Sequence, residues 1–384
     1  MSEWKKVKLG DLYEVHNGLS KGRQFFGTGF PFLTFSNVFN NWFLPEELES
    51  LVQTTDKERE ACSIKAGDVF ITRTSETMDE LGMSSVALKD YPNATYNGFT
   101  KRLRPITNRV NPRYIGYYLR TPKFRGQFMA FSTMTTRASL ANNDLLNMEV
   151  ELPSMEIQHR IATILSRYDS LIENYQKQIK LLEEAAQRLY KKWFIDLHFP
   201  RHENTNIIDG VPEGWEKKKL GDITPIITGK KDANFGTPDG EYPFFTCSQE
   251  PIKAPSFSFD CAAVLLAGNG DFNVKLYRGR FEAYQRTYVL SPYIDSHLYL
   301  LFYTISANMT KLAAGSSGST IKFLTKGMID GINLNVPNDE ILRSFNKKVE
   351  PIQSSRESLQ SQLRLLTEAR DRLLPKLMSG EITI

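Results

Sequence analysis

The sequence predicts an α+β protein made of two similar halves, each a mixed α/β domain followed by a long helix. The opening of the chain is repeated, because residues 4–11 read WKKVKLGD and residues 215–222 read WEKKKLGD. A helical segment is repeated as well, as QIKLLEEA at 178–185 and QLRLLTEA at 362–369. Between these anchors the copies resemble each other only in scattered places. A constant frame with dissimilar fillings indicates one architecture that presents two different surfaces.

The composition is that of an ordinary globular protein. The chain has 384 residues, 41% of them hydrophobic and 24% charged, which is enough for two to four domains. Its net charge of +4 is compatible with a nucleic-acid partner but too small to indicate one alone. The three cysteines have no metal-ligand spacing, and the N-terminus lacks the apolar core of a signal peptide. We therefore expect a cytoplasmic protein that does not contact a membrane.

Globular and helical segments alternate along the chain. Residues 1–153 contain short strand-like runs, such as 68–72 and 84–88, and one helix is expected over 111–119 with Pro112 in its first turn. The predicted segments are a first mixed domain (1–153), a first long helix (154–197), a polar linker (198–212), a second mixed domain (213–337), and a second long helix with the C-terminal tail (338–384).

Both long helices carry apolar residues at alternating spacings of three and four, which is typical of a coiled-coil seam. The predicted seam includes Leu165, Ile172, Ile179, Leu182 and Leu189 in the first helix and Ile352, Leu359, Leu363, Leu366 and Leu373 in the second. Because the helices follow equivalent domains, we expect them to pack antiparallel about a pseudo-twofold axis. At about 1.5 Å per residue the seam spans on the order of 40 Å.

Two arginines, Arg356 and Arg370, fall on the second seam. A long arginine side chain can extend its charged end to the edge of the seam, and a polar seam position can fix register or partner choice. Alternatively, the seam drifts by one position at these residues. The spacing alone leaves both interpretations open.

The sequence contains no recognisable catalytic arrangement. It has no nucleophile elbow, P-loop or HExxH motif. The Gly268–Phe272 segment lacks the third glycine and the following helix of a dinucleotide site. His198 and His202 are four residues apart, but Pro200 breaks the helical geometry that a metal site would need, so we expect no metal. If the protein takes part in catalysis, another chain does the chemistry.

The candidate binding residues are polar and basic, and they lie in loops at the ends of strand-like runs. Lys and Arg neutralise phosphates, Ser and Thr bond phosphate oxygens, and Asn, Gln and Arg can read base edges. Any single loop could instead be a solvated turn, but the two copies place such loops equivalently, for example Tyr96-Asn97 and Tyr284-Gln285. The candidates are Lys21, Arg23, Thr72, Arg73, Thr74, Lys101, Arg102, Arg137, Lys230, Lys231, Asn269, Arg278, Arg280, Gln285, Arg286, Ser316, Ser317, Ser319 and Lys322.

Several motifs in order carry a family resemblance. They are the repeated Trp-x-x-x-x-Leu-Gly-Asp opening, GDVFITRT at 67–74, the helix start LPSMEIQ at 152–158, the Leu-Leu-Glu helix, and WFIDLHFP at 193–200. Over essentially its whole length the chain resembles the DNA-specificity (S) subunit of a type I restriction–modification system. In the second copy Ala267-Gly268-Asn269 replaces Thr72-Arg73-Thr74, which is expected if the halves read different sequences.

The resemblance implies a noncatalytic subunit with two target recognition domains, each reading one half of a split double-stranded DNA sequence. It also implies that the paired helices set the gap and bind two methyltransferase subunits. The cofactors, S-adenosylmethionine, ATP and Mg²⁺, would then be on the methyltransferase and restriction subunits, with none in this chain. Half-sites one helical turn apart, about 34–36 Å, suit a seam of this length. The partner is either a separate methyltransferase or a fused methyltransferase–nuclease.

Two other classes of function stay open. The first is a coiled-coil scaffold with two protein- or ligand-binding domains, which predicts no salt-dependent DNA binding. The second is an autonomous enzyme, which predicts methyl transfer or cleavage by the isolated chain.

Overall fold

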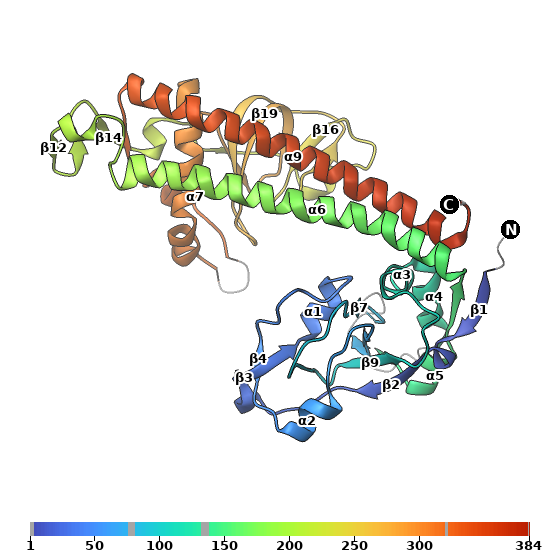
Figure 1. Cartoon of the computed structure of the whole chain (residues 1–384). Coiled ribbons are helices and arrows are strands. Elements are labelled where there is room, and N and C mark those ends of the chain that lie inside the picture. The colour runs from blue at the N-terminus through green and yellow to red at the C-terminus, as the bar shows by residue number, and fades with distance from the viewer. Residues whose placement is uncertain (1–3, 76–80, 132–137, 319–321, 383) are drawn as a thin grey trace. The chain divides into compact units, whose positions relative to one another are not determined.

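The computed structural model describes residues 4–75, 81–131, 138–318, 322–382 and 384. The chain divides into two compact units. Unit 1 comprises residues 1–174 and 362–384, and unit 2 comprises residues 175–361. Each of the two long helices contributes a segment to both units, so each unit contains a mixed α/β domain and two helical segments (Figure 1).

Unit 1 contains a four-stranded sheet in the order β2-β9-β5-β7 and a three-stranded sheet in the order β4-β3-β8. Antiparallel pairs β1·β11 and β6·β10 complete it. The strands are β1 (Lys5–Lys8), β2 (Tyr13–Asn17), β3 (Phe26–Leu33), β4 (Leu51–Val52), β5 (Val69–Thr72), β6 (Thr74–Ser75), β7 (Ser84–Val86), β8 (Thr95–Tyr96), β9 (Thr100–Pro105), β10 (Ala138–Ser139) and β11 (Glu149–Leu152).

Three short helices of unit 1 follow a residue whose side chain accepts from a free backbone N–H group of the first turn, namely Thr34, Thr55 and Asn111. Asn111 caps α3 by accepting from the backbone N–H groups of Arg113 and Tyr114, and Pro112 occupies the first helical position. The helix expected over 111–119 is thus confirmed. The helices are α1 (Phe35–Asn40), α2 (Asp56–Ala61), α3 (Pro112–Tyr118), α4 (Pro122–Phe131) and α5 (Asn142–Asn147).

Unit 2 repeats this topology in one six-stranded sheet, ordered β15-β20-β18-β19-β16-β17, and one antiparallel pair, β14·β21. A long strand, β19, pairs with both β18 and β16, whereas in unit 1 the separate strands β7 and β8 pair with β5 and β3. The strands are β14 (Glu216–Lys219), β15 (Ile227–Thr228), β16 (Tyr242–Phe245), β17 (Ile252–Ala254), β18 (Phe259–Ala267), β19 (Val274–Ala283), β20 (Thr287–Leu290) and β21 (Asn333–Val336).

The helices of unit 2 are α7 (Leu298–Gly315) and α8 (Lys326–Asp330), and the hairpin of β12 (Ile207–Ile208) and β13 (Val211–Pro212) precedes them in sequence. Tyrosines at equivalent positions are buried in both units, Tyr114 and Tyr118 on α3 and Tyr299 and Tyr303 on α7. Each helix therefore packs its tyrosine face into the core of its own unit.

The two long helices are α6 (Met155–Tyr190) and α9 (Asp339–Ser379). They run antiparallel in each unit, because Asp169 meets Arg370 in unit 1 and Glu183 meets Arg356 in unit 2. Among the ten predicted seam residues Leu165 is buried and the others are partly buried, whereas Leu171, Leu181 and Leu365, off the seam, are exposed. The predicted α+β class, with two mixed domains and two long antiparallel helices, is confirmed.

The repeated tryptophans have equivalent places in the two units. In unit 2 the Trp215 ring is buried against Phe199 and Phe194, with centroid distances of 4.8 and 5.7 Å. In unit 1 the Trp4 indole lies against the turn after α9, where Gly380 has a φ of +74° and a side chain would come within 3.0 Å of the Trp4 Nε1 atom. The repeated opening thus anchors the start of each domain at the end of a long helix.

Candidate nucleic-acid interface

The first candidate surface is a loop that occurs in both units, residues 18–25 in unit 1 and 229–235 in unit 2. A glycine starts each loop where it crosses a neighbouring backbone, since an added Cβ would lie 2.0 Å from the Asn97 carbonyl oxygen at Gly18 and 1.9 Å from that of Ala283 at Gly229. We call these the lysine–phenylalanine loops, because each holds an ammonium group over an aromatic ring. The Nζ atom of Lys21 lies 4.9 Å from the Phe25 ring centroid, and that of Lys231 lies 4.3 Å from the Phe235 centroid.

The surroundings of these two loops differ. In unit 1 the Lys21 ammonium also pairs with Glu58 at 2.7 Å, and this hydrogen bond, followed by that from the Thr55 backbone, lowers the pKa of Glu58. Arg23 is exposed beside it, together with Phe25 and Phe26. These side chains offer positive charge and aromatic surface, a combination that suits phosphates and bases.

In unit 2 the corresponding surface is more polar. Lys230 and Arg286 are exposed, and the Gln285 side chain donates to Asp232. The Gln285 backbone N–H donates to the Lys231 carbonyl at 2.9 Å, which ties the turn at Gln285 to the lysine–phenylalanine loop of the same unit. The second unit therefore presents a different set of donors and acceptors at an equivalent place in the fold.

The second candidate surface lies where a central strand ends, after β5 in unit 1 and after β18 in unit 2. Arg73 is partly buried there, and its backbone is held by Phe99 at 3.0 Å and Leu140 at 3.1 Å. Its buried Nε atom has no hydrogen-bond partner among the described residues. Phe99 is 59% exposed, so this turn presents an aromatic ring to solvent beside Arg73.

At the equivalent strand end of unit 2, Asn269 pairs with Phe323 in an isolated antiparallel bridge. Backbone bonds from Gly270 to Lys322 (3.1 Å) and from Leu324 to Gly268 (2.8 Å) hold the segment after α7 against this turn. Lys322 and Phe323 are exposed. Both strand ends thus carry a polar side chain beside an exposed phenylalanine, although the two phenylalanines come from different loops.

Three predicted contacts are wrong, because the side chains lie inside unit 1. Arg102 is 2% exposed, and its guanidinium donates to the backbone carbonyls of Ser63 (2.7 Å) and Ala61 (3.3 Å). Lys101 is 4% exposed and bonded to Asn142, and burial lowers its pKa. Thr72 is fully buried, and its hydroxyl accepts from the Met83 backbone at 2.9 Å.

Some of the remaining predicted residues are described by the structure, and others lie outside the described residues. Arg278 bonds the Tyr299 hydroxyl at 2.8 Å and lies 3.7 Å from Glu350 on α9, while Arg280 pairs with Asp260 at 3.2 Å. Ser316 bonds the last turn of α7 through Ala313 at 2.6 Å, and Ser317 is exposed. The Thr74 side chain, Arg137 and Ser319 lie outside the described residues. All of these remain predictions.

The sequence places Phe99 in a candidate loop, but the exposed aromatic residues Phe25, Phe26, Phe99 and Phe323 are absent from the predicted contacts. The signal for Phe99 is its place in the polar stretch Asn97-Gly98-Phe99-Thr100-Lys101. Such rings can stack on bases or contact the thymine methyl group.

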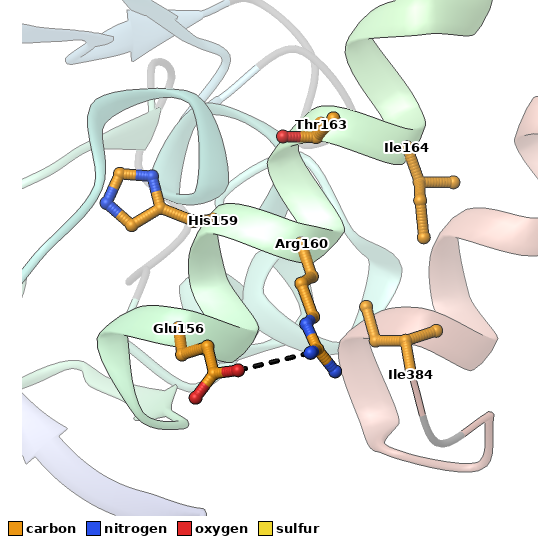
Figure 2. A pocket seen from close by; sticks show the side chains of 6 residues that line it. All are labelled: Glu156, His159, Arg160, Thr163, Ile164 and Ile384. Carbon is orange, nitrogen blue, oxygen red and sulfur yellow. Dashed lines mark ion pairs between the residues drawn. The ribbon is translucent and has the colours of Figure 1, made fainter.

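Figure 2 shows a shallow hollow of unit 1 on the first turns of α6. Glu156 and Arg160 form an ion pair of 3.1 Å within the helix, and Ile164 and Ile384 supply aliphatic surface. These side chains offer no pairing of a nucleophile with a base. Within the described part of the chain, no group of three His, Cys, Asp or Glu side chains could hold a metal ion, and no described helix is long and apolar enough to cross a bilayer.

These features define a class of protein, an internally duplicated binding protein whose halves share one topology and differ in their exposed loops. The sequence model for the type I restriction modification DNA specificity domain matches residues 1–184 and 212–355. The chain belongs to this family.

Relatives and a solved structure agree with this assignment. The EcoDI type I restriction enzyme specificity subunit of Escherichia coli is 37% identical over 177 residues, 45% of this chain and 40% of that subunit, so this match spans less than half of the relative. The MjaIX specificity subunit of Methanocaldococcus jannaschii is 26% identical over 100% of this chain and 94% of its own length. The crystal structure of the M. genitalium type I S subunit shares the fold, with a TM-score of 0.64 at 16% identity over 98% of this chain and 96% of that one.

Proposed function

We propose that the chain recognises a DNA sequence in two parts, one half-site read by each unit, with a gap of unspecified sequence between them. The observation that carries this proposal is the repeated topology with different exposed loops. Unit 1 presents Arg73 and Phe99 at the end of its central strand, where unit 2 presents Asn269 and Phe323. Arginine prefers guanine and asparagine prefers adenine in the major groove, so the two units favour different bases.

The proposal assigns the chemistry to other chains. The two units contain basic and aromatic loops. The buried Arg102 donates to the Ser63 carbonyl, and the partly buried Arg104 pairs with Asp68. In this assignment the methyltransferase subunits, two per chain, hold S-adenosylmethionine, and restriction subunits use ATP and Mg²⁺. The chain itself is noncatalytic, works in the cytoplasm, and recognises the DNA sequence on which the other subunits act.

A salt series of electrophoretic shifts tests the proposal most simply. The chain is bound to its methyltransferase partner and titrated against duplex DNA at increasing ionic strength. Because lysine and arginine release counterions from phosphates, the logarithm of the affinity should fall linearly with the logarithm of the salt concentration. A salt-independent signal, or no binding by the complex, would favour a protein-binding scaffold. Methyl transfer or cleavage by the isolated chain would instead establish an autonomous enzyme.

A further inference from the structure

Two arginines on the seam of α9 form ion pairs with carboxylates of α6. The Arg370 guanidinium lies 2.9 Å from Asp169 in unit 1, and that of Arg356 lies 3.5 Å from Glu183 in unit 2. The arginine side chains are only 15% and 12% exposed, so they remain on the seam and their stems are buried. The interpretation in which the seam drifts away from these residues is therefore wrong.

Each pair is built into its own unit. In unit 1 the Tyr117 hydroxyl donates to the second oxygen of Asp169, Asp371 also accepts from Arg370 at 2.9 Å, and the guanidinium lies 5.4 Å from the Trp42 ring. Burial lowers the pKa of Arg370, but the hydrogen bonds to Asp169 and Asp371 outweigh it and raise the pKa overall. In unit 2 the Arg356 guanidinium lies 5.7 Å from the Phe302 ring. These arginines are thus held in one position.

The charges follow a period of two heptads on both helices. On α9, every seventh residue from 349 alternates between apolar and basic: Val349, Arg356, Leu363, Arg370 and Leu377. On α6, every seventh residue from 162 alternates between uncharged and acidic: Ala162, Asp169, Gln176, Glu183 and Tyr190. Asp169 and Glu183 are fourteen residues apart, as are Arg356 and Arg370, so one antiparallel register satisfies both pairs.

A slipped register would separate these charges from their partners on the other helix. If α9 moved by one heptad in either direction, Arg370 would come opposite Gln176 or Ala162, and Asp169 would come opposite Leu377 or Leu363. A slip of two heptads would keep one ion pair and place the other arginine opposite Leu197 or Met155. Because the two arginine side chains are only 12% and 15% exposed, separating them from their carboxylates costs free energy, so each alternative register is disfavoured.

We propose that the Asp169–Arg370 and Glu183–Arg356 pairs lock the register of α6 against α9 and thereby fix the length of the gap between the half-sites. The chain connects each domain directly to its own helix, since only two residues separate β11 from α6 and two separate β21 from α9. The register of the two helices is therefore coupled to the spacing of the domains. A shift of one heptad is about 10 Å along a helix, or about three base pairs of DNA.

The test removes the charges without weakening the seam. In a charge-free variant, Asp169→Gln, Glu183→Gln, Arg356→Leu and Arg370→Leu are combined. Because apolar side chains often replace buried ion pairs without loss of stability, we expect a thermal midpoint equal to or above that of the wild type. Methylation mapping of the complex should nevertheless show additional gaps, about three base pairs longer or shorter. The matched control, Arg356→Lys with Arg370→Lys, keeps both charges and should retain the single wild-type gap.

The gap readout rests on the proposed function, so a second readout measures the register without DNA. In chains whose three native cysteines are replaced by alanine, Asp169→Cys with Arg370→Cys reports the register seen here, and Asp169→Cys with Leu363→Cys reports the slipped one. The thiols at positions 169 and 363 should stay reduced while Glu183, Arg356 and Arg370 are present. They should form a disulfide once Glu183→Gln, Arg356→Leu and Arg370→Leu are added.

A charge-free variant that keeps the wild-type gap alone, or a slipped thiol pair that stays reduced in it, would overturn the register lock. A wild-type complex that methylates no split sequence would overturn the proposed function instead, and the thiol readout would still decide the register.

Discussion

At the scale of single residues, burial separates the charged side chains near strand ends into interior supports and candidate DNA contacts. Arg102 and Arg73 illustrate the two groups, because one donates to backbone carbonyls inside unit 1 and the other lies beside the exposed Phe99. The two arginines occur in similar polar, basic stretches of sequence. Mutation of a candidate DNA contact should therefore change sequence recognition, whereas mutation of an interior support should lower stability.

Arg73→Ala should weaken methylation and relax the sequence requirement at one half-site only. Loss of a bidentate base contact costs about 1–3 kcal/mol, or roughly ten- to a hundredfold in affinity. Methylation rates on DNA libraries randomised at each half-site measure the effect. Arg109→Ala, an exposed arginine of the same unit away from both candidate surfaces, is the matched control. Unchanged rates in Arg73→Ala would refute the assignment.

Arg102→Met should behave in the opposite way. It removes the arginine donor of the Ala61 carbonyl and one of the two donors of the Ser63 carbonyl, which also accepts from Arg104 at 3.0 Å. The loss costs about 1–3 kcal/mol and lowers the thermal midpoint by several degrees. The half-sites and the gap should stay the same in methylation maps of the folded variant. A variant of wild-type stability with an altered half-site would show that Arg102 reads DNA after all.

The sequence could not have distinguished these residues. Lys101 and Arg102 belong to β9, a central strand between β2 and β5, and their partners are more than 35 residues away in the chain, at Asn142, Ala61 and Ser63. A strand reading TKRLRP looks like a solvated edge because its charges are visible and its acceptors are not. The backbone contact between Arg73 and Phe99 also joins segments that are far apart in the chain.

At the scale of elements, the long helices were the most predictable part, because a period of three and four over many turns has no other good explanation. The strand order was not predictable from pattern alone. In unit 1 two separate strands, β7 and β8, pair with β5 and β3. In unit 2 the single strand β19 pairs with the equivalent strands, β18 and β16. Pairing between distant segments, not local preference, decides such differences.

Inserting one heptad into each long helix should lengthen the gap. If the insertions lie between Asp169 and Glu183 in α6 and between Arg356 and Arg370 in α9, both ion pairs keep their partners. The gap should grow by about three base pairs, since seven residues add about 10 Å. The same insertion in α6 alone breaks one pair and should abolish methylation. A fully active double insertion with an unchanged gap would show that the helices do not set it.

At the scale of the whole molecule, the duplication assigns one half-site to each unit. Replacing residues 213–337 with the corresponding segment of another family member should change one half-site and leave the other half-site and the helices' seam as they are. Methylation mapping of the chimera with the same methyltransferase partner reads both half-sites together. A change in both half-sites would mean that the units do not read DNA independently.

The most direct test of the central claim is single-molecule methylation mapping of genomic DNA treated with the wild-type chain and its methyltransferase partner. We expect one methylated sequence in two specific parts, different from each other and separated by a gap of a single fixed length. Methylation at one continuous sequence, at two identical half-sites, or at half-sites with variable gaps would contradict it.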